Sequence, residues 1–357
     1  MNKGLQELFK HLWKSALFWA FAFFSLAVFR YFGLNQEILQ ATGQNINSTP
    51  IKVPFIIATT IGLVLGILFG LLNYFFDKSI AQKVSLGFSI LLKTLSHFLA
   101  TVFTITLGLT LLSKIFPLNI NLEPGWWLTN RRFWAAMWFI VLSSIIFSFI
   151  KIAIERFGRG VFLKMLLGHY KTPQEENRVF MFLDLKDSTF IAEKLGYHKY
   201  SQFIQDCFSD LNEVVIEYNA EIYQYVGDEA VLSWSYNKAL ENNNCIGIFF
   251  AFEAQRKQKE SYYLKKYNIF PEFKAGIHGG KLMVAEVGSI KKELAYHGDV
   301  INTSARIQTE CNTYNTTLLI SEKLLNDLQE NIKSKFLGNI LLKGKLKEIK
   351  IHSVESM

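Results

Sequence analysis

The stretch Tyr223-Gln224-Tyr225-Val226-Gly227-Asp228-Glu229-Ala230-Val231-Leu232 predicts the element around which the later half of the chain is organised. An alternating strand runs into Gly227-Asp228, and a second apolar strand continues to Trp234. Two strands joined by a Gly-Asp pair are typical of a β-hairpin. The tip of the hairpin carries two adjacent carboxylates that folding does not require, so their use depends on partners elsewhere in the chain.

The composition indicates a membrane part joined to a soluble part. Of the 357 residues 50% are hydrophobic and 32 are Phe, which is too apolar for a uniformly soluble protein. The formal net charge is +8, but the basic residues are spread along the chain, so we expect no nucleic-acid partner. Cys207, Cys245 and Cys311 lie far apart without disulfide or metal-ligand spacing, which suits a reducing cytosol.

Four largely apolar stretches of the first 154 residues are long enough to cross a lipid bilayer, which takes about 20 residues. We predict transmembrane helices at about 12–34, 53–76, 90–113 and 133–154. A cleaved signal peptide is the alternative for the first stretch, but this stretch is rich in Phe and lacks a small-residue cleavage site. Lys93 and His97 in the third stretch are expected to snorkel or pack.

The flanking charges predict the orientation of these four helices. An even number of spans puts both chain ends on one side, and basic residues lie before the first span and after the last. Positive charge favours the cytoplasmic side, so we expect the N-terminus and the later half of the chain in the cytoplasm. Arg131 and Arg132 on the opposite side weaken this rule without reversing it.

The remaining chain divides into a joint, residues 155–177, and a domain, residues 178–357. The joint contains three glycines and an apolar run, Val161 to Leu167, and we expect it to transmit changes from the membrane part. The domain mixes strands and helices without a strict βαβ repeat, which favours an α+β fold. We predict a helix from Asn237 to about Lys266 and two strands around Gly279-Gly280.

Several polar residues are placed where they could meet at one site. Asp184 stands where a buried strand ends and a helix begins, a position that suits a divalent cation beside backbone N–H groups that hold phosphate. With Asp228 it could bind one or two Mg²⁺ ions for phosphoryl or nucleotidyl transfer. Asn302 and Arg306 share one helix face, and Lys343 and Lys345 flank a glycine in a predicted turn. Taken singly, Asp184 could be only a helix cap, Asn302 and Arg306 only a surface pair, and Lys343 and Lys345 only a basic turn.

The same residues lie in motifs that resemble the catalytic domain of the class III nucleotidyl cyclases. The motifs appear in the family's order across roughly 178–355: Phe182-Leu183-Asp184-Leu185-Lys186-Asp187-Ser188-Thr189, Val226-Gly227-Asp228-Glu229, Gly276-Ile277-His278-Gly279-Gly280, Gly298-Asp299-Val300-Ile301-Asn302-Thr303-Ser304-Ala305-Arg306 and Leu342-Lys343-Gly344-Lys345. The resemblance implies a ferredoxin-like palm domain after the all-α four-helix membrane module. It also implies a bacterial inner-membrane protein that forms a homodimer with shared sites.

The resemblance assigns roles by position. Asp184, Asp228 and the Leu185 carbonyl would bind two Mg²⁺ or Mn²⁺ ions per site. Asn302 and Arg306 of the partner chain would position the ribose and stabilise the reacting phosphate. The nucleotide would also be held by Ser188, Thr189 and the Lys343 or Lys345 turn. The implied reaction is attack of the ribose 3′-OH of ATP on its α-phosphate, giving 3′,5′-cyclic AMP and pyrophosphate.

Two positions that select the purine in this family depart from its pattern. The family commonly has Lys at the position of Gln224 and Asp or Thr at that of Ala295. The pair typical of guanylate-specific members is also missing, so ATP is the expected substrate. A guanylate or relaxed-specificity cyclase and an inactive nucleotide-binding receptor are the alternatives. Asp187 replaces a usual glycine, and we expect it to cap the helix that follows.

Overall fold

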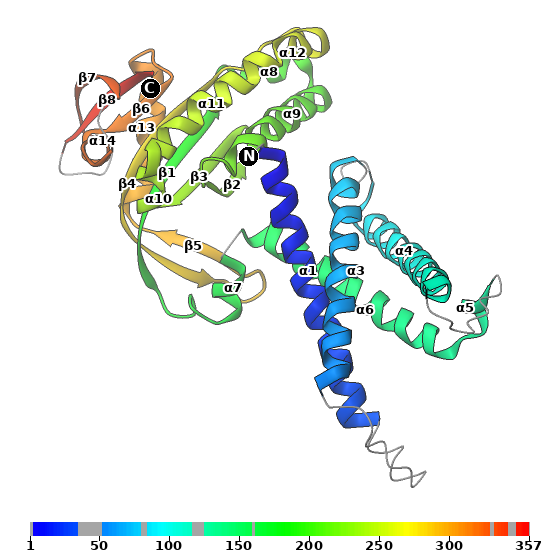
Figure 1. Ribbon diagram of the computed structural model, residues 1–357. Helices are drawn as coiled ribbons and strands as arrows, with labels where there is room; N and C mark the ends of the chain where they lie inside the picture. The colour runs from blue at the N-terminus through cyan, green and yellow to red at the C-terminus, as the bar shows by residue number, and fades with distance from the viewer. Residues whose placement is uncertain are drawn as a thin grey trace. The chain divides into compact units, whose positions relative to one another are not determined.

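The computed structural model describes residues 3–34, 52–79, 84–115, 125–158, 161–328, 332–341 and 348–356. The chain divides into two compact units (Figure 1). We call Met1–Ala153 the helical unit and Ile154–Met357 the sheet unit.

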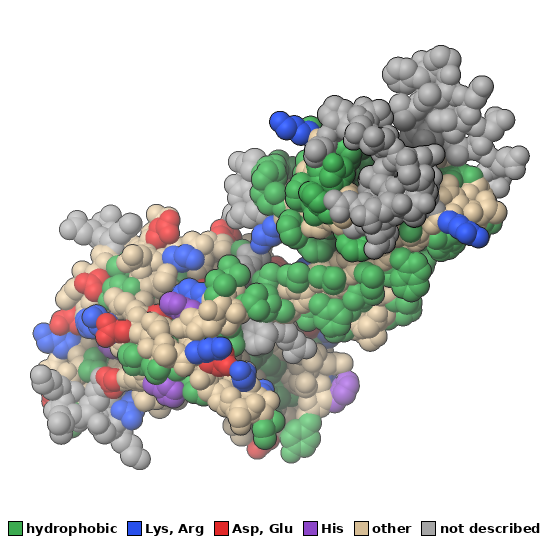
Figure 2. All heavy atoms as spheres, turned by 90° about the horizontal axis from the view of Figure 1, so that it is seen from below, with side chains coloured by type: hydrophobic (Ala, Val, Ile, Leu, Met, Phe, Trp, Pro, Cys, Tyr) green, Lys and Arg blue, Asp and Glu red, His purple; other side chains and the backbone are tan. Residues whose placement is uncertain are grey.

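The helical unit consists of long apolar helices. They are α1 (Lys3–Phe29) with a π-helical turn at Arg30–Leu34, α3 (Lys52–Ser79), α4 (Leu86–Ile115), the short α5 (Trp126–Thr129) and α6 (Arg131–Phe157). Four segments of the described residues are long and apolar enough to cross a membrane: His11–Phe32, Pro54–Ser79, Leu86–Leu107 and Phe133–Ile154. Figure 2 shows mostly hydrophobic side chains on the helical unit, whereas the sheet unit carries a mixture of acidic and basic side chains.

Helices α1 and α3 pack at very short range because α3 presents glycines to α1. A Cβ atom added at Gly62 would lie 2.5 Å from the Trp19 carbonyl, and one at Gly66 would lie 2.7 Å from the Cα of Ala16. Small residues allow this backbone approach between apolar helices, where burial of apolar surface gives no driving force in lipid. Trp19 and Phe69 fill the space beside these glycines and are fully buried.

Charged side chains tie three helices of the helical unit together. Asp77 of α3 pairs with Lys93 of α4 at 2.5 Å and with Lys151 of α6. Lys93 therefore makes an ion pair within the bundle and does not simply snorkel. His97 packs, as expected, and its Nδ1 lies 2.6 Å from the Ser144 hydroxyl.

The sheet unit contains one mixed sheet with helices around it. Its described elements are α7 (Val161–Leu166), β1 (Gln174–Leu185), α8 (Ser188–Leu195), α9 (Tyr197–Val215), β2 (Glu221–Val226), β3 (Glu229–Ser235), α10 (Tyr236–Leu240), α11 (Asn244–Gln258), α12 (Glu260–Tyr267), β4 (Phe273–Val287), β5 (Glu293–His297), α13 (Asp299–Thr313), β6 (Leu318–Ser321), α14 (Glu322–Asp327), β7 (Lys333–Ile340) and β8 (Ile349–Ser356). The strand order is β2-β3-β1-β4-β6-β8-β7, and β5 pairs with β4. Only β4 and β6 run parallel among the described pairs.

The central strands separate two faces of the sheet. Val179, Met181, Leu183 and Leu185 of β1 join the main core, with residues of α9 and α11. Side chains alternate along a strand, so Phe180, Phe182 and Asp184 point to the opposite face. Phe180 and Phe182 belong to a smaller cluster there, with Tyr223 and Tyr296.

Two predictions of secondary structure were wrong, and one strand was missed. The helix expected over 237–266 is broken into α10, α11 and α12. Asn242 and Asn243 adopt positive φ angles of 51° and 53° between α10 and α11, and Lys259, with a φ of −100°, separates α11 from α12. The two strands expected around Gly279-Gly280 are one strand, β4. Gly279 is needed there for space, since an added Cβ would lie 2.8 Å from the Tyr236 ring. Strand β5 was not predicted.

Candidate active site

Strand pairing places Asp184 between two ionisable neighbours. In the sheet register Asp184 of β1 pairs with Glu229 of β3 on one side and with Lys274 of β4 on the other. Directly opposed residues share a face of the sheet. The three side chains therefore lie on the face that carries Phe180 and Phe182, away from the main core.

Asp184 is held by polar partners from two other elements. The Lys274 ammonium lies 3.2 Å from Oδ2, and the Gln308 amide of α13 donates to the same oxygen at 3.1 Å. Burial raises the pKa of Asp184, Lys274 opposes that rise, and the nearby Asp228 carboxylate adds to it. Asp184 thus sits in a half-buried position with both negative and positive neighbours.

Glu229 makes this site strongly acidic. Burial raises the pKa of Glu229 to about 7, and the charges of Asp184 and Asp228 add to the shift. We call Asp184, Asp228 and Glu229 the carboxylate cluster. Mutual repulsion of this kind is relieved when a cation binds.

The donor set of the carboxylate cluster fits a hard divalent cation, because Mg²⁺ prefers carboxylate and carbonyl oxygens. Within the described residues, no three His, Cys, Asp or Glu side chains converge closely enough to hold an ion by themselves. A cation here would therefore need further oxygens, from the backbone or from a substrate. Magnesium commonly keeps such an incomplete protein shell when it binds phosphates.

Asp228 stands at the tip of the predicted hairpin, which the structure confirms. Strands β2 and β3 pair antiparallel from Glu221 to Val226 and are joined by Gly227 and Asp228. Gly227 has a φ of +64° and Asp228 does not have a positive φ. This is the pattern of a type II′ turn, which favours Gly at its first central position. The turn presents the Asp228 side chain beside the end of β1.

The connection from β1 to α8 carries the other residues predicted around Asp184. Leu185 is buried at the strand end, and Ser188 and Thr189 open α8. Burial together with the Asp228 charge raises the pKa of Tyr200, on the neighbouring helix α9, to about 12. The short α8 thus begins within reach of the electrostatic field of the carboxylate cluster.

Asp187 does not cap α8 as predicted. It occupies the N-cap position, but its side chain makes no capping hydrogen bond. Its φ of 55° is left-handed, a conformation that costs an L-residue free energy and suits glycine. The conformation explains why the side chain cannot reach back to the helix.

Asn302 and Arg306 lie on the side of α13 that faces away from the sheet. The buried residues of this helix include Thr303, Ile307 and Gln308, whereas Asn302 is exposed and Arg306 is half-buried. Neither makes a hydrogen bond or ion pair with another described residue. The fold of one chain thus directs Gln308, and not this pair, to Asp184.

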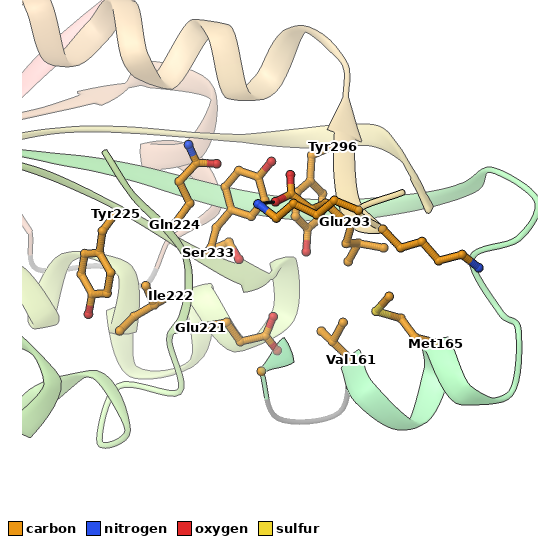
Figure 3. A pocket seen from close by; sticks show the side chains of 14 residues that line it. Val161, Met165, Glu221, Ile222, Gln224, Tyr225, Ser233, Glu293 and Tyr296 are labelled. Atoms are coloured by element: carbon orange, nitrogen blue, oxygen red, sulfur yellow. Dashed lines mark ion pairs between the residues drawn. The ribbon is translucent and has the colours of Figure 1, made fainter. Parts of the chain in front are cut away.

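Gln224 lines a cavity of about 710 Å³ between β2, β5 and α7 (Figure 3). A β-bulge between Ile222 and Gln224 changes the alternation of the strand. Tyr223 therefore packs on Tyr296, whereas Tyr225 stacks on Phe208 of α9 on the opposite face. The carboxylate cluster does not line this cavity.

Ala295 does not line the cavity, although the purine-selecting role was predicted for it together with Gln224. Its neighbours Leu294 and Tyr296 both pack in the cluster around Phe180. Ala295 between them points to the other face of β5. Lys343 and Lys345 lie outside the described residues.

Sequence reasoning missed Lys274, Gln308 and the contribution of Glu229. Lys274 directly precedes the segment Ala275-Gly276-Ile277-His278, and Gln308 lies six residues after Asn302. Neither position has a signal of its own, because its contact with Asp184 depends on strand register and on how α13 lies across the sheet. Glu229 was noted as a hairpin carboxylate without a role.

Two curated proteins are similar to this chain in sequence. Adenylate cyclase 2 of Rhizobium meliloti (strain 1021) is 35% identical over 202 residues, which are 56% of this chain and 56% of that protein. Adenylate cyclase 1 of the same organism is 26% identical over 178 residues, 49% of this chain and 27% of that protein. The chain thus spans about half the length, or less, of these curated relatives.

A solved structure supports the fold. A bacterial light-regulated adenylyl cyclase matches 60% of this chain and 63% of its own, with 17% identity and a TM-score of 0.52. Residues 170–356, more than half of the chain, match the family described as the adenylate and guanylate cyclase catalytic domain. The predicted fold class, an all-α module followed by a cyclase-type α+β domain, is confirmed. The chain belongs to the adenylate and guanylate cyclase catalytic domain family.

Proposed function

We propose that the protein is a membrane-bound adenylate cyclase that converts ATP to 3′,5′-cyclic AMP and pyrophosphate. The observation that carries the proposal is the carboxylate cluster, which gathers Asp184, Asp228 and Glu229 at one end of the sheet of a cyclase-family domain. The name of the Rhizobium relative, adenylate cyclase 2, supports the choice of adenine. In the reaction a bond forms between O3′ and the α-phosphorus, the bond to pyrophosphate breaks, and the proton of the 3′-hydroxyl is released to solvent.

Asp184, Asp228 and the Leu185 carbonyl would hold two Mg²⁺ or Mn²⁺ ions in each site. Bound ions of this kind stabilise charge on the attacking and leaving oxygens of a displacement at phosphorus. Lys274 and Gln308 position the Asp184 carboxylate by holding its Oδ2 atom. The N–H groups at the start of α8, at Ser188 and Thr189, face anions favourably because they are not used within the helix.

The partner chain of a homodimer would supply Asn302 and Arg306. These side chains have no described partner in their own chain, and they lie on the side of α13 opposite to Gln308. An amide and a guanidinium on one helix face can hold a ribose hydroxyl and a phosphate. One chain carries both half-sets, so a symmetric dimer would have two equivalent sites. A lysine of the Lys343–Lys345 turn would bind the triphosphate.

Base selection is proposed for Gln224. Its amide can both donate and accept hydrogen bonds toward the edge of a purine. It is exposed in the cavity beside Tyr296. Ala295 offers no polar group, so adenine is favoured here by the relative and by the missing guanylate-type pair.

The helical unit would anchor the protein in a bacterial inner membrane. Its four candidate spans carry mostly exposed apolar side chains. Basic residues flank the first and last spans, which supports a cytoplasmic N-terminus and a cytoplasmic sheet unit.

The test is a nucleotide assay on the full-length protein in membranes. ATP or GTP is supplied with Mn²⁺ or Mg²⁺, and the products are separated by chromatography. We expect cyclic AMP from ATP, no product after chelation of the metal, and none from an Asp184→Ala variant. A preference for GTP would establish a guanylate cyclase instead. No product with either metal would favour a nucleotide-binding receptor.

A further inference from the structure

Helix α7 in the joint presents a stripe of exposed leucines. Leu163, Leu166 and Leu167 are 59%, 70% and 77% exposed. Leu167 directly follows the helix and keeps its geometry, because its N–H donates to the Leu163 carbonyl at 3.0 Å. Residues three and four apart lie on one side of a helix, so the three side chains form one stripe. Contiguous exposed apolar side chains on a folded unit mark a contact surface, whereas single ones are ordinary.

The opposite side of α7 is attached to the sheet. Val161 and Met165 line the cavity of about 710 Å³ beside β2 and β5, and Figure 3 shows both side chains directed into it. Lys164 donates to the Tyr170 hydroxyl at 3.2 Å and to Glu176 at 3.3 Å. These contacts orient α7, and they leave the leucine stripe on the side that is turned away from the sheet.

The loop between β4 and β5 adds one apolar side chain near α7. Ile290 is fully exposed, and Lys291 and Lys292 after it line the same cavity as α7. Figure 1 shows α7 beside β5. Lys291 pairs with Glu293 and Lys292 pairs with Glu286, so the loop presents an apolar end without net charge. We call Leu163, Leu166, Leu167 and Ile290 the apolar tips.

The chain keeps α7 close to the end of the last candidate span. That span ends at Ile154, the helix continues to Phe157, and α7 begins at Val161. A helix rises 1.5 Å per residue and an extended chain spans at most about 3.5 Å per residue, so α7 begins within about 20 Å of the span. A bilayer that holds the span is therefore within reach of the leucine stripe.

The chain around α7 is basic. Residues 155–171 contain four Lys or Arg residues, Arg156, Arg159, Lys164 and Lys171, and one acidic residue, Glu155. Anionic lipids of the cytoplasmic leaflet attract basic residues next to a span. A second copy of the chain would bring the same positive charge, which disfavours the pairing of two leucine stripes. The charge therefore favours an anionic lipid surface as the occupant.

Amphipathic segments of this kind lie in the plane of a bilayer surface, with their apolar side chains about 5–10 Å deep. We propose that the apolar tips dock the sheet unit on anionic lipid, with their side chains between the headgroups and the acyl chains. Helix α7 then contacts lipid on one side and the cavity of Gln224 on the other. This docking rests on the proposed insertion of the helical unit into a bilayer.

The test measures the depth of spin labels on the full-length protein in nanodiscs of phosphatidylcholine with about 30% phosphatidylglycerol. A single cysteine replaces each apolar tip in turn, and the three native cysteines are buried and so do not take the label. Oxygen concentrates in lipid and a nickel chelate in water, so the ratio of their collision rates reports depth. We expect this ratio to be at least about fivefold higher at each apolar tip than in Leu264→Cys, which labels an exposed leucine of α12.

Three outcomes would contradict the docking. Ratios equal to that of Leu264→Cys at the α7 positions or at Ile290 would overturn the proposal. Exclusion of both reagents, together with magnetic coupling between labels on two chains, would overturn it as well, because a second copy would then cover the apolar tips. Nanodiscs of phosphatidylcholine alone should lower the ratio at each apolar tip about threefold, and an unchanged ratio would refute the attraction to anionic lipid.

Carbonate extraction and the nucleotide assay separate the docking from the proposed function. Release of the protein by carbonate would refute the insertion of the helical unit itself. Retention in the membrane with water-like ratios at the apolar tips would refute only the docking. Lipid-like ratios in a protein that forms no cyclic nucleotide would refute only the catalytic proposal.

Discussion

Asp184 receives opposing influences that suit an exchangeable metal ligand. Burial raises its pKa, while the Lys274 ammonium at 3.2 Å favours the ionised form. Lys274 therefore stabilises the ionised form of Asp184, which burial and the Asp228 charge disfavour. Gln308 fixes the orientation of the same group by donating at 3.1 Å.

Asp184→Asn should remove activity while leaving the fold intact. Asn keeps an oxygen that can accept from Gln308 but loses the charge that a divalent cation needs. We expect turnover to fall by a factor of about 10³ or more, measured as cyclic AMP formed with saturating Mn²⁺. Asp187→Asn is the control, because this carboxylate is exposed and makes no capping bond, and it should change turnover less than about twofold. A comparable loss in both variants would place Asp187 in the metal site.

Glu229 should make the metal-free protein less stable at high pH. Its pKa in the folded state, about 7, lies above its ordinary value of 4.5, so folding favours the protonated form. The stability that Glu229 contributes is therefore complete below pH 4.5 and is lost as the pH rises through 7.

Glu229→Gln isolates this effect. The variant should match the wild type at pH 4 and exceed it at pH 8 by about 1 kcal/mol, after allowance for solvent screening of a half-exposed group. The measurement is urea unfolding of residues 154–357 in the presence of EDTA. A wild type that is more stable than the variant at pH 8 would contradict the assignment.

At the scale of elements, the approach of α13 to β4 positions the site. Gly276 permits it, since an added Cβ would lie 2.2 Å from the backbone nitrogen of Gln308. Gly276→Ala should force the helix away, weaken the Gln308–Asp184 bond and destabilise the sheet unit by about 3 kcal/mol. Gly280→Ala is the control, because its nearest neighbours at 3.1 and 3.3 Å are the ends of the Val300 and Lys323 side chains. Equal unfolding midpoints for the two variants would show that α13 can move away from β4 without destabilising the sheet unit.

The elements also show where sequence reasoning works. The hairpin has a strong local signal, the Gly-Asp turn, and was confirmed. The apolar run before Asp184 correctly indicated a strand, but this strand runs from Gln174 to Leu185, so it begins within the predicted joint and ends one residue after Asp184. The glycine pair in β4 gives the local signal of a turn, yet Gly279 is required by the nearby Tyr236 ring. Such a requirement arises from packing between distant segments.

The same limit explains the missed contacts of the site. Lys274 and Gln308 meet Asp184 through strand register and helix placement, which no short stretch encodes. For Ala295 the spacing of the sequence motifs gives the position along the chain. The pairing of β5 with β4 decides on which face of the sheet its side chain lies. Neither face nor register follows from spacing alone when a bulge or an edge strand intervenes.

At the scale of the whole molecule, the two half-sets of site residues do not meet within one chain. Gln308 points from α13 to Asp184, while Asn302 and Arg306 occupy the other side of that helix without described partners. The proposed homodimer would bring the half-sets together, with one copy supplying the carboxylates and the other supplying the helix pair.

Mixing two inactive variants tests this arrangement. Asp228→Ala and Arg306→Ala should each be inactive alone, because every site in either homodimer lacks one essential group. In a mixed dimer one site loses both groups and the other keeps both. Random pairing makes about half of the dimers mixed, so co-expression should restore about a quarter of the wild-type activity per dimer. The control mixes Asp228→Ala with Asp184→Ala, which remove groups from the same half-set and should restore nothing. No recovery in the first mixture, despite dimers seen by light scattering, would mean that each chain builds its site alone. Recovery in the control would mean that Asp184 and Asp228 of one site come from different chains.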